Sequence, residues 1–341
     1  MSWDVGQSWK HILRFLLGVA ILVVLLKAFR VSQWQRIFHF HWVYMIGAGV
    51  ASLGGNIVGT LRWKHTLRAV GVEEGLGFAN LLKLYMSGTV LGFAFVGGSG
   101  SLAYQALALK KQWNVPYTKV AFSLTLDRML DPFLTLLLFV PALFYLSEQI
   151  TIKYFSMAIW LLFGTLIVIS IIGRNHLRGL FSYGLRFVAQ MDRLARWLKS
   201  FFQSTNNPFP VNHSIKADLN SYPFSPSYLA SLTLGRMILL LLRLQLLAHA
   251  LGAIIPIEII LIGLLVLQLS WLLAITPGGI GIAEWGWVGV LVRYGCRATD
   301  ATLLSVAFRL YLIVFSLLAL VIAFLLCFYQ NRQIQQEIVE T

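Results

Sequence analysis

The chain has 341 residues, of which 58% are hydrophobic and only 12% charged, a composition outside the range of soluble domains. Its 27 Lys and Arg against 13 Asp and Glu give a formal net charge of +14, and most of these cations lie in loops beside predicted helix ends. Such a distribution follows the positive-inside rule, so we expect anionic membrane lipids as partners and no nucleic acid. We expect a multi-pass protein integral to the cell membrane, the cytoplasmic membrane if the source is bacterial.

A membrane-spanning helix needs about 20 apolar residues, and several runs of the chain reach that length. They predict an all-α fold, a polytopic transmembrane helical bundle in a single transmembrane domain over 1–341. We expect about eight long helices plus two short broken or re-entrant helices. The long helices are predicted near 11–30, 38–60, 77–96, 119–146, 153–173, 226–251, 256–276 and 300–328, and the short ones near 98–112 and 279–294.

The segment 174–225 is polar and separates two apolar regions. Its first part carries Arg and Lys with apolar residues between them, which predicts an amphipathic helix on the cytoplasmic face. Its second part is rich in Asn and Pro and predicts a loop.

The sequence from about Ser52 to Ala142 recurs without a gap 181 positions later. Chance apolar similarity would match Leu to Leu, but it would not keep arginines and glycines in register. The repeat copies are predicted at about 38–146 and 219–328. The distribution of positive charge favours inverted copies, whereas short segments that re-enter and return on the same side would make them parallel. The matched positions include Arg62 with Arg243, Arg128 with Arg309, Gly54 with Gly235, and Gly71 with Gly252.

Each copy also contains a Gly-rich turn between a long apolar run and a short segment. Clustered glycines allow a sharp break in a membrane helix, and the first N–H groups of the next helix then lack partners and attract anions. Close packing of helices through small residues is the alternative. The candidate anion-binding glycines are Gly97, Gly98 and Gly100 in the first copy and Gly278, Gly279 and Gly281 in the second.

Charged residues inside the predicted helices form the second candidate feature. Asp131 lies three residues after Arg128, so a local ion pair is available there. Glu284 is the candidate partner of Arg309, because Phe308 and Leu312 replace acids beside that arginine. One interpretation is that these arginines and acids form buried structural ion pairs. The arginines outnumber the acids, however, which favours a cationic cavity for lipid phosphate. The candidate phosphate-binding residues are Arg62, Arg128, Arg236, Arg243 and Arg309, and the acidic partners are Asp127, Asp131 and Glu284.

Signatures of catalysis are weak, so whether the protein is an enzyme stays open, with a transporter favoured. Asp127 and Asp131 could hold Mg²⁺ as in prenyl-type transferases, but Arg128 between them and the missing second acidic motif argue against it. We expect no metal site and no cofactor.

Three stretches together resemble a flippase-like membrane family that includes the transmembrane region of lysylphosphatidylglycerol synthases. They are Leu61-Arg62-Trp63-Lys64 with Leu67 to Gly71, Leu126 to Asp131, and Thr276-Pro277-Gly278-Gly279-Ile280-Gly281 with Glu284. The resemblance covers roughly residues 40–328. The aminoacyl transferase domain of the synthases is not expected, so their lysyl transfer is not carried over.

The resemblance implies lipid handling. We expect a translocase that moves an anionic or aminoacylated phospholipid, or a polyprenyl-phosphate-linked lipid, between leaflets. A separate lipid-modifying enzyme could be a partner. The alternatives are a membrane-embedded transferase acting on a lipid phosphate and an accessory lipid-binding protein.

Overall fold

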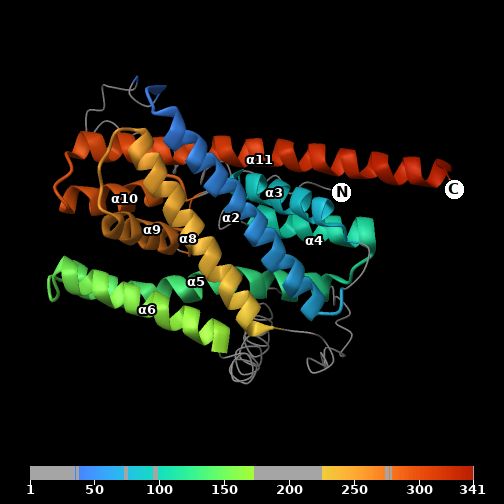
Figure 1. The fold of residues 1–341 in the computed structure, drawn as a ribbon, viewed down its shortest axis with the longest axis horizontal. Helices are drawn as coiled ribbons and strands as arrows, with labels where there is room; N and C mark the ends of the chain where they lie inside the picture. Colours follow the sequence, from blue (N-terminus) through green and yellow to red (C-terminus); the bar gives the residue numbers. More distant parts are fainter. Residues whose placement is uncertain are drawn as a thin grey trace, which may run out of the picture.

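The computed structural model describes residues 35, 38–72, 76–94, 99–172, 225–272, 276 and 279–340. All regular elements in this part of the chain are helices, which confirms the predicted all-α fold (Figure 1). The predicted helix near 11–30 and the segment 174–224 lie outside the described residues. The helices are α2 (Trp42–Ala69), α3 (Phe78–Ala94), α4 (Ser99–Trp113), α5 (Tyr117–Leu146), α6 (Ile152–Ile172), α8 (Pro226–Ala250), α9 (Ile257–Leu272), α10 (Ile282–Arg293) and α11 (Ala298–Glu340).

Two helices are longer than the apolar runs that predicted them. Helix α2 continues to Ala69, beyond the expected end near 60, and α11 continues to Glu340, beyond the expected end near 328. Hydropathy locates the part of a helix that fits the hydrocarbon of a membrane. The helix itself continues because Arg, Lys, Gln and Glu are all good helix formers.

Three helix ends share one local geometry, in which a glycine takes a positive φ. After α2, Gly71 has φ 72°, and after α8, Gly252 has φ 76°. The N–H of Val72 donates to the carbonyl of Leu67, and that of Ala253 donates to the carbonyl of Ala248. These are Schellman motifs, which satisfy the last carbonyls of each helix. Gly295 ends α10 in the same manner.

Helices α2 and α8 pack against each other in antiparallel directions along their lengths (Figure 1). At one end the N–H of His41 donates to the carbonyl of Ala250 at 2.9 Å. At the other end the N–H of Ser225 donates to Nε2 of His65 at 3.3 Å. Gly47 lies against Leu246 between these ends, where a Cβ atom at this glycine would come within 3.2 Å of the leucine side chain.

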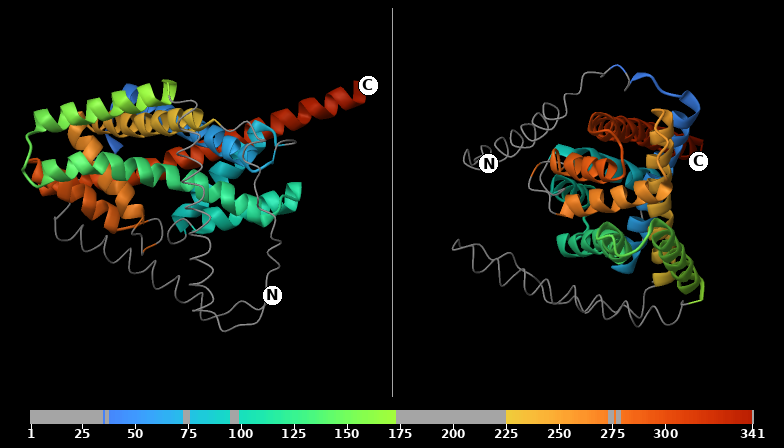
Figure 2. Two further views of the ribbon diagram at one scale, coloured as in Figure 1. Left: turned by 90° about the horizontal axis from the view of Figure 1, so that it is seen from below. Right: turned by 90° about the vertical axis from the view of Figure 1, so that its left-hand side faces the viewer.

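The remaining helices complete two hydrophobic cores. One core lies mainly between α5, α6, α8, α9, α10 and α11, and the other mainly between α2, α3, α4 and parts of α5 and α11. Figure 2 shows α2 and α8 together along one side of the bundle, with α11 extending past the other helices at its C-terminal end. A smaller apolar cluster of Ala69, Leu126 and Leu229 joins the end of α2 to the first half of α5 and the start of α8.

The outer faces of the bundle carry large apolar side chains. Phe133 on α5, Trp160 on α6 and Leu325 on α11 are each more than half exposed. Within the described ranges, four helical segments are long and apolar enough to cross a membrane, namely Trp42–Ala69, Lys119–Leu146, Ser227–Ala250 and Ala298–Gln330. Apolar side chains that face outward from such helices are suited to contact with lipid tails. The chain is therefore a helical membrane protein.

Candidate functional site

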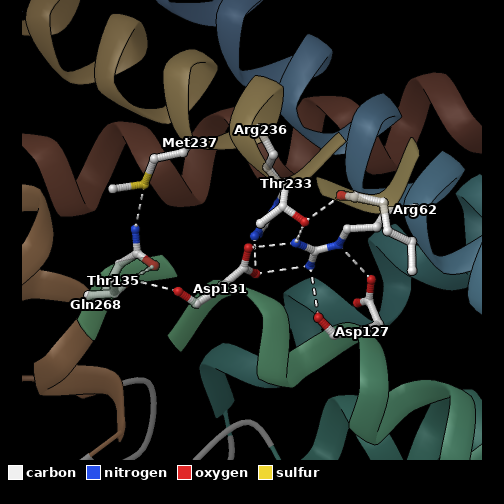
Figure 3. A network of polar contacts seen from close by, with 9 residues as sticks. Arg62, Asp127, Asp131, Thr135, Thr233, Arg236, Met237 and Gln268 are labelled. Atoms are coloured by element: carbon white, nitrogen blue, oxygen red, sulfur yellow. Dashed lines mark hydrogen bonds and ion pairs between the residues drawn. The ribbon is translucent and has the colours of Figure 1, made fainter. Parts of the chain in front are cut away.

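Arg62 of α2 is the centre of a buried ionic network between α2, α5 and α8 (Figure 3). Its side chain has no exposed surface, and its Nε donates to Oδ1 of Asp127 at 2.8 Å. Its Nη atoms donate to both carboxylate oxygens of Asp131, to the carbonyl of Asp127 and to Oγ1 of Thr233. A guanidinium has five N–H donors, so all five of Arg62 are satisfied.

Asp131 joins this network to α8, because it also accepts a hydrogen bond from Nη1 of Arg236. The series of polar contacts then continues along α5. Thr135 donates to Oε1 of Gln268 on α9 at 2.8 Å, and the amide of Gln268 contacts the sulfur of Met237. Two arginines thus meet two aspartates, and the centre is electrically balanced.

Local sequence places both aspartates on the face of α5 that meets α2. Asp127 and Asp131 are four residues apart, a spacing that aligns side chains on one side of a helix. Pro132 follows directly and is inside α5. It has no N–H to donate to the carbonyl of Arg128 four residues earlier, which opens the helix ladder next to the ionic centre.

A second ionic contact joins α10 to α11. Nε of Arg309 donates to Oε1 of Glu284 at 2.5 Å, so the predicted pairing of these residues is confirmed. The other carboxylate oxygen of Glu284 accepts from the N–H of Gly281 at 2.6 Å, which caps the start of α10. The carboxylate of Glu284, only 4% exposed, therefore occupies the N-terminal position at which an anion was expected.

Arg243 of α8 lies beside this second contact and is only 8% exposed. It lines a cavity of about 20 Å³ together with Glu284, Ser305 and Arg309. Within the described part of the chain no carboxylate lies at ion-pair distance from Arg243. The cavity has room for about one water molecule. A phosphate group could enter it only after the surrounding helices separate.

Arg128 of α5 faces α3 and α4 instead of its neighbour Asp131. Its Nη2 donates to Oγ of Ser101 at 3.1 Å, and its guanidinium lies 5.9 Å from the ring centroid of Tyr85. The Nε atom is buried, and it has no hydrogen-bond partner in the part of the chain that the structure describes. The local pair that spacing made available to Arg128 and Asp131 does not form, because Arg62 and Arg236 take both oxygens of Asp131.

Part of the Gly-rich turns lies within the described residues. Gly279 and Gly281 have φ values of 66° and 87°, which agrees with a sharp break before α10. Gly100 is in the first turn of α4. Gly97, Gly98 and Gly278 lie outside the described residues.

Several polar residues at these centres were not among the candidates chosen from the sequence. They are Ser101, Gln105, Thr233 and Gln268. Single Ser, Thr and Gln residues in apolar helices are common and carry no distinctive spacing. A helical-wheel comparison of α4 with the arginine faces could have drawn attention to Ser101 and Gln105, which are four residues apart.

Fold and site together define a helical membrane protein with arginines and acids gathered inside the bundle. The chain belongs to the family of the lysylphosphatidylglycerol synthase transmembrane region, whose model matches residues 11–327. Comparison with curated proteins and with solved structures gives no match. The resemblance expected from the sequence motifs is therefore confirmed at the level of the family.

Proposed function

We propose that the protein is a lipid translocase that moves an anionic or aminoacylated phospholipid, or a polyprenyl-phosphate-linked lipid, between leaflets. The observation that carries the proposal is the unequal pairing of five arginines with three acids. Arg62 and Arg236 are balanced by two aspartates, and Arg309 is balanced by Glu284. Arg128 and Arg243 have no carboxylate partner among the described residues.

An arginine without a counter-ion is expensive inside a membrane bundle. Insertion scales give about 2.5–3.5 kcal/mol for one Arg at the centre of a membrane helix. An anionic headgroup would remove that cost, since a guanidinium can bind phosphate oxygens with two parallel hydrogen bonds. The family is named for a lipid-modifying synthase, which agrees with a lipid as the ligand.

The relation between the two halves explains why these two arginines remain unbalanced. The counterparts of Asp127 and Asp131, 181 residues later, are Phe308 and Leu312, and both line the cavity that contains Arg243. The counterpart of Glu284 is Ala103, so Arg128 has no acid where Arg309 has one. Each half thus lacks the acids of the other, and each presents one cation to a ligand.

Helix directions support an inverted repeat, which stays part of the proposal. Helices α2 and α8 occupy matching positions of the two copies and end 181 residues apart, at Ala69 and Ala250. They run antiparallel, and α5 and α11 also run in opposite directions (Figure 1). Inverted copies allow one half to rock against the other and so alternate access to a site between the leaflets.

We then assign a structural role to Arg62, Arg236 and the three acids Asp127, Asp131 and Glu284. Because all five donors of Arg62 are used, it has none for a phosphate. The same contacts engage both aspartates, which argues against their use as metal ligands by a transferase.

Reconstituted vesicles with fluorescent phosphatidylglycerol test the proposal, with dithionite quenching as the measure of lipid exposed on the outer leaflet. We expect the parent protein to flip this lipid, and the double variant Arg128→Met/Arg243→Met to be slower by about tenfold or more, since each charged hydrogen bond contributes about 1.5–3 kcal/mol. Arg293→Met is the matched control, because this arginine is 44% exposed at the end of α10. Equal rates for the parent and the double variant would refute the assignment. Lipid binding by a parent that flips nothing would favour the accessory lipid-binding alternative.

A further inference from the structure

Gln105 of α4 is buried with no exposed surface, and neither atom of its amide has a hydrogen-bond partner among the described residues. Leaving a polar group in this state costs about 1–3 kcal/mol, and buried groups without partners are uncommon in native proteins. An amide with an unused acceptor and two unused donors is therefore a feature that a bound ligand could satisfy.

The amide lies next to the unbalanced cation of the first half. A Cβ atom at Gly88 would be 2.6 Å from Nε2 of Gln105 and 2.9 Å from Oγ of Ser101, so these two side chains meet at the same glycine. Ser101 in turn accepts from Arg128, whose Nε is buried and unused. Tyr85 closes the group from α3, with its hydroxyl against Gly59.

The unused atoms specify the chemistry of a ligand. Nε of Arg128 and Nε2 of Gln105 are donors, which suit phosphate oxygens. Oε1 of Gln105 is an acceptor and needs a donor, which a hydroxyl group on the substituent of the phosphate would supply. We propose that Arg128, Ser101 and Gln105 form a headgroup subsite that binds a phosphate ester bearing a hydroxyl group on the esterified alcohol or sugar.

This subsite adds a headgroup specificity to the proposed function. It rests on the lipid binding in that proposal and not on the movement of lipid between leaflets. Arg128 is partly exposed whereas Gln105 is enclosed, so the phosphate would approach through Arg128 and the hydroxyl would reach the amide as α4 shifts from α3. The ligand would then satisfy groups that have no hydrogen-bond partner among the described residues. Specificity for the hydroxyl would come from Gln105, and attraction for the charge from Arg128.

Two lipids of equal charge test the inference. Phosphatidylglycerol carries hydroxyl groups on its headgroup, and phosphatidylmethanol carries none. We expect the parent in detergent micelles to bind phosphatidylglycerol about tenfold more tightly, the upper range for one hydrogen bond to a buried group. Gln105→Met keeps the approximate length and shape of the side chain and should bring the ratio of the two dissociation constants close to one. Gln112→Met, an exposed glutamine on the same helix, should keep the ratio of the parent.

A second variant covers the case in which Gln105→Met does not fold. Gly88→Ala leaves Gln105 in the chain but pushes its amide away from Ser101, and it should also lower the ratio. A ratio of dissociation constants near one for the parent, or an unchanged ratio in folded Gln105→Met, would overturn the inference. Neither result would contradict the proposed lipid flipping. Parent protein that binds neither lipid would overturn the proposed function as well. Glycerol 3-phosphate, which has hydroxyl groups, and methyl phosphate, which has none, serve as water-soluble counterparts of the two lipids. If only these soluble esters show binding that depends on the hydroxyl group, the subsite is retained but its ligand is a water-soluble ester.

Discussion

Arg62→Met is predicted to destabilise the protein strongly, because it removes the centre of the ionic network. The side chain has no exposed surface and donates to Asp127, Asp131 and Thr233. Asp131 keeps Arg236 as a partner, but Asp127 is 1% exposed and loses its only ion pair among the described residues. Removing one partner of a buried ion pair costs about 3–5 kcal/mol. We expect a loss of this size in the free energy of unfolding.

Unfolding is measured by an SDS titration in mixed micelles, with circular dichroism as the readout. The double variant Arg62→Met/Asp127→Leu removes the isolated carboxylate as well, and it should be more stable than Arg62→Met alone, since apolar replacement of a buried ion pair is often close to neutral. Glu148→Gln is the control, because it breaks an exposed contact with Arg293 and should cost less than about 1 kcal/mol. If Arg62→Met unfolds at the SDS concentration of the parent but loses lipid binding, Arg62 is a ligand residue and the structural assignment is wrong.

Two further predictions concern packing and reactivity. Gly263→Ala should prevent folding or lower stability by about 3 kcal/mol or more, because its Cβ would be 1.0 Å from the ring of buried Trp287. Gly289→Ala on α10, with nothing within 4 Å, should be neutral or slightly stabilising in the same SDS titration, and equal behaviour of the two variants would contradict this packing. Burial, with a smaller contribution from Asp300, raises the pKa of the Cys296 thiol above its ordinary 9.0. A raised pKa means that less thiolate is present at a given pH. In a Cys327→Ser background, Asp300→Asn should lower the pKa of Cys296 and speed its alkylation by iodoacetamide at pH 8.5. An unchanged alkylation rate would argue against the contribution of Asp300.

The positions of most helices could be predicted from the sequence, because a membrane helix must satisfy its backbone internally and therefore appears as a long apolar run. The predicted runs near 77–96, 119–146 and 226–251 correspond to α3, α5 and α8 with ends that differ by a few residues. The helical extensions of α2 and α11 could not be predicted by this signal, since they are polar and hydropathy does not report helix formation outside the hydrocarbon.

The pairing of Arg309 with Glu284 could also be predicted, because comparison of the two repeat copies made Glu284 the nearest candidate acid. The pairing of Arg128 with Asp131 could not be judged correctly, because spacing along one helix says which residues are neighbours and not which way they face. Arg62 reaches Asp127 from 65 residues away, and it also binds Asp131, the carboxylate that local spacing made available to Arg128.

By itself the sequence determined that this is a helical membrane protein of the lysylphosphatidylglycerol synthase transmembrane-region family, with arginines in excess of acids inside its helices. Only the tertiary structure decided which arginines are neutralised. Helix packing brings α5 against α2 and α8, so that Asp127 and Asp131 balance Arg62 and Arg236. Charge pairing acts over a few ångströms in space, and distance along the chain does not measure that separation. Arg128 and Arg243 are thereby left as the cations for which a ligand is proposed.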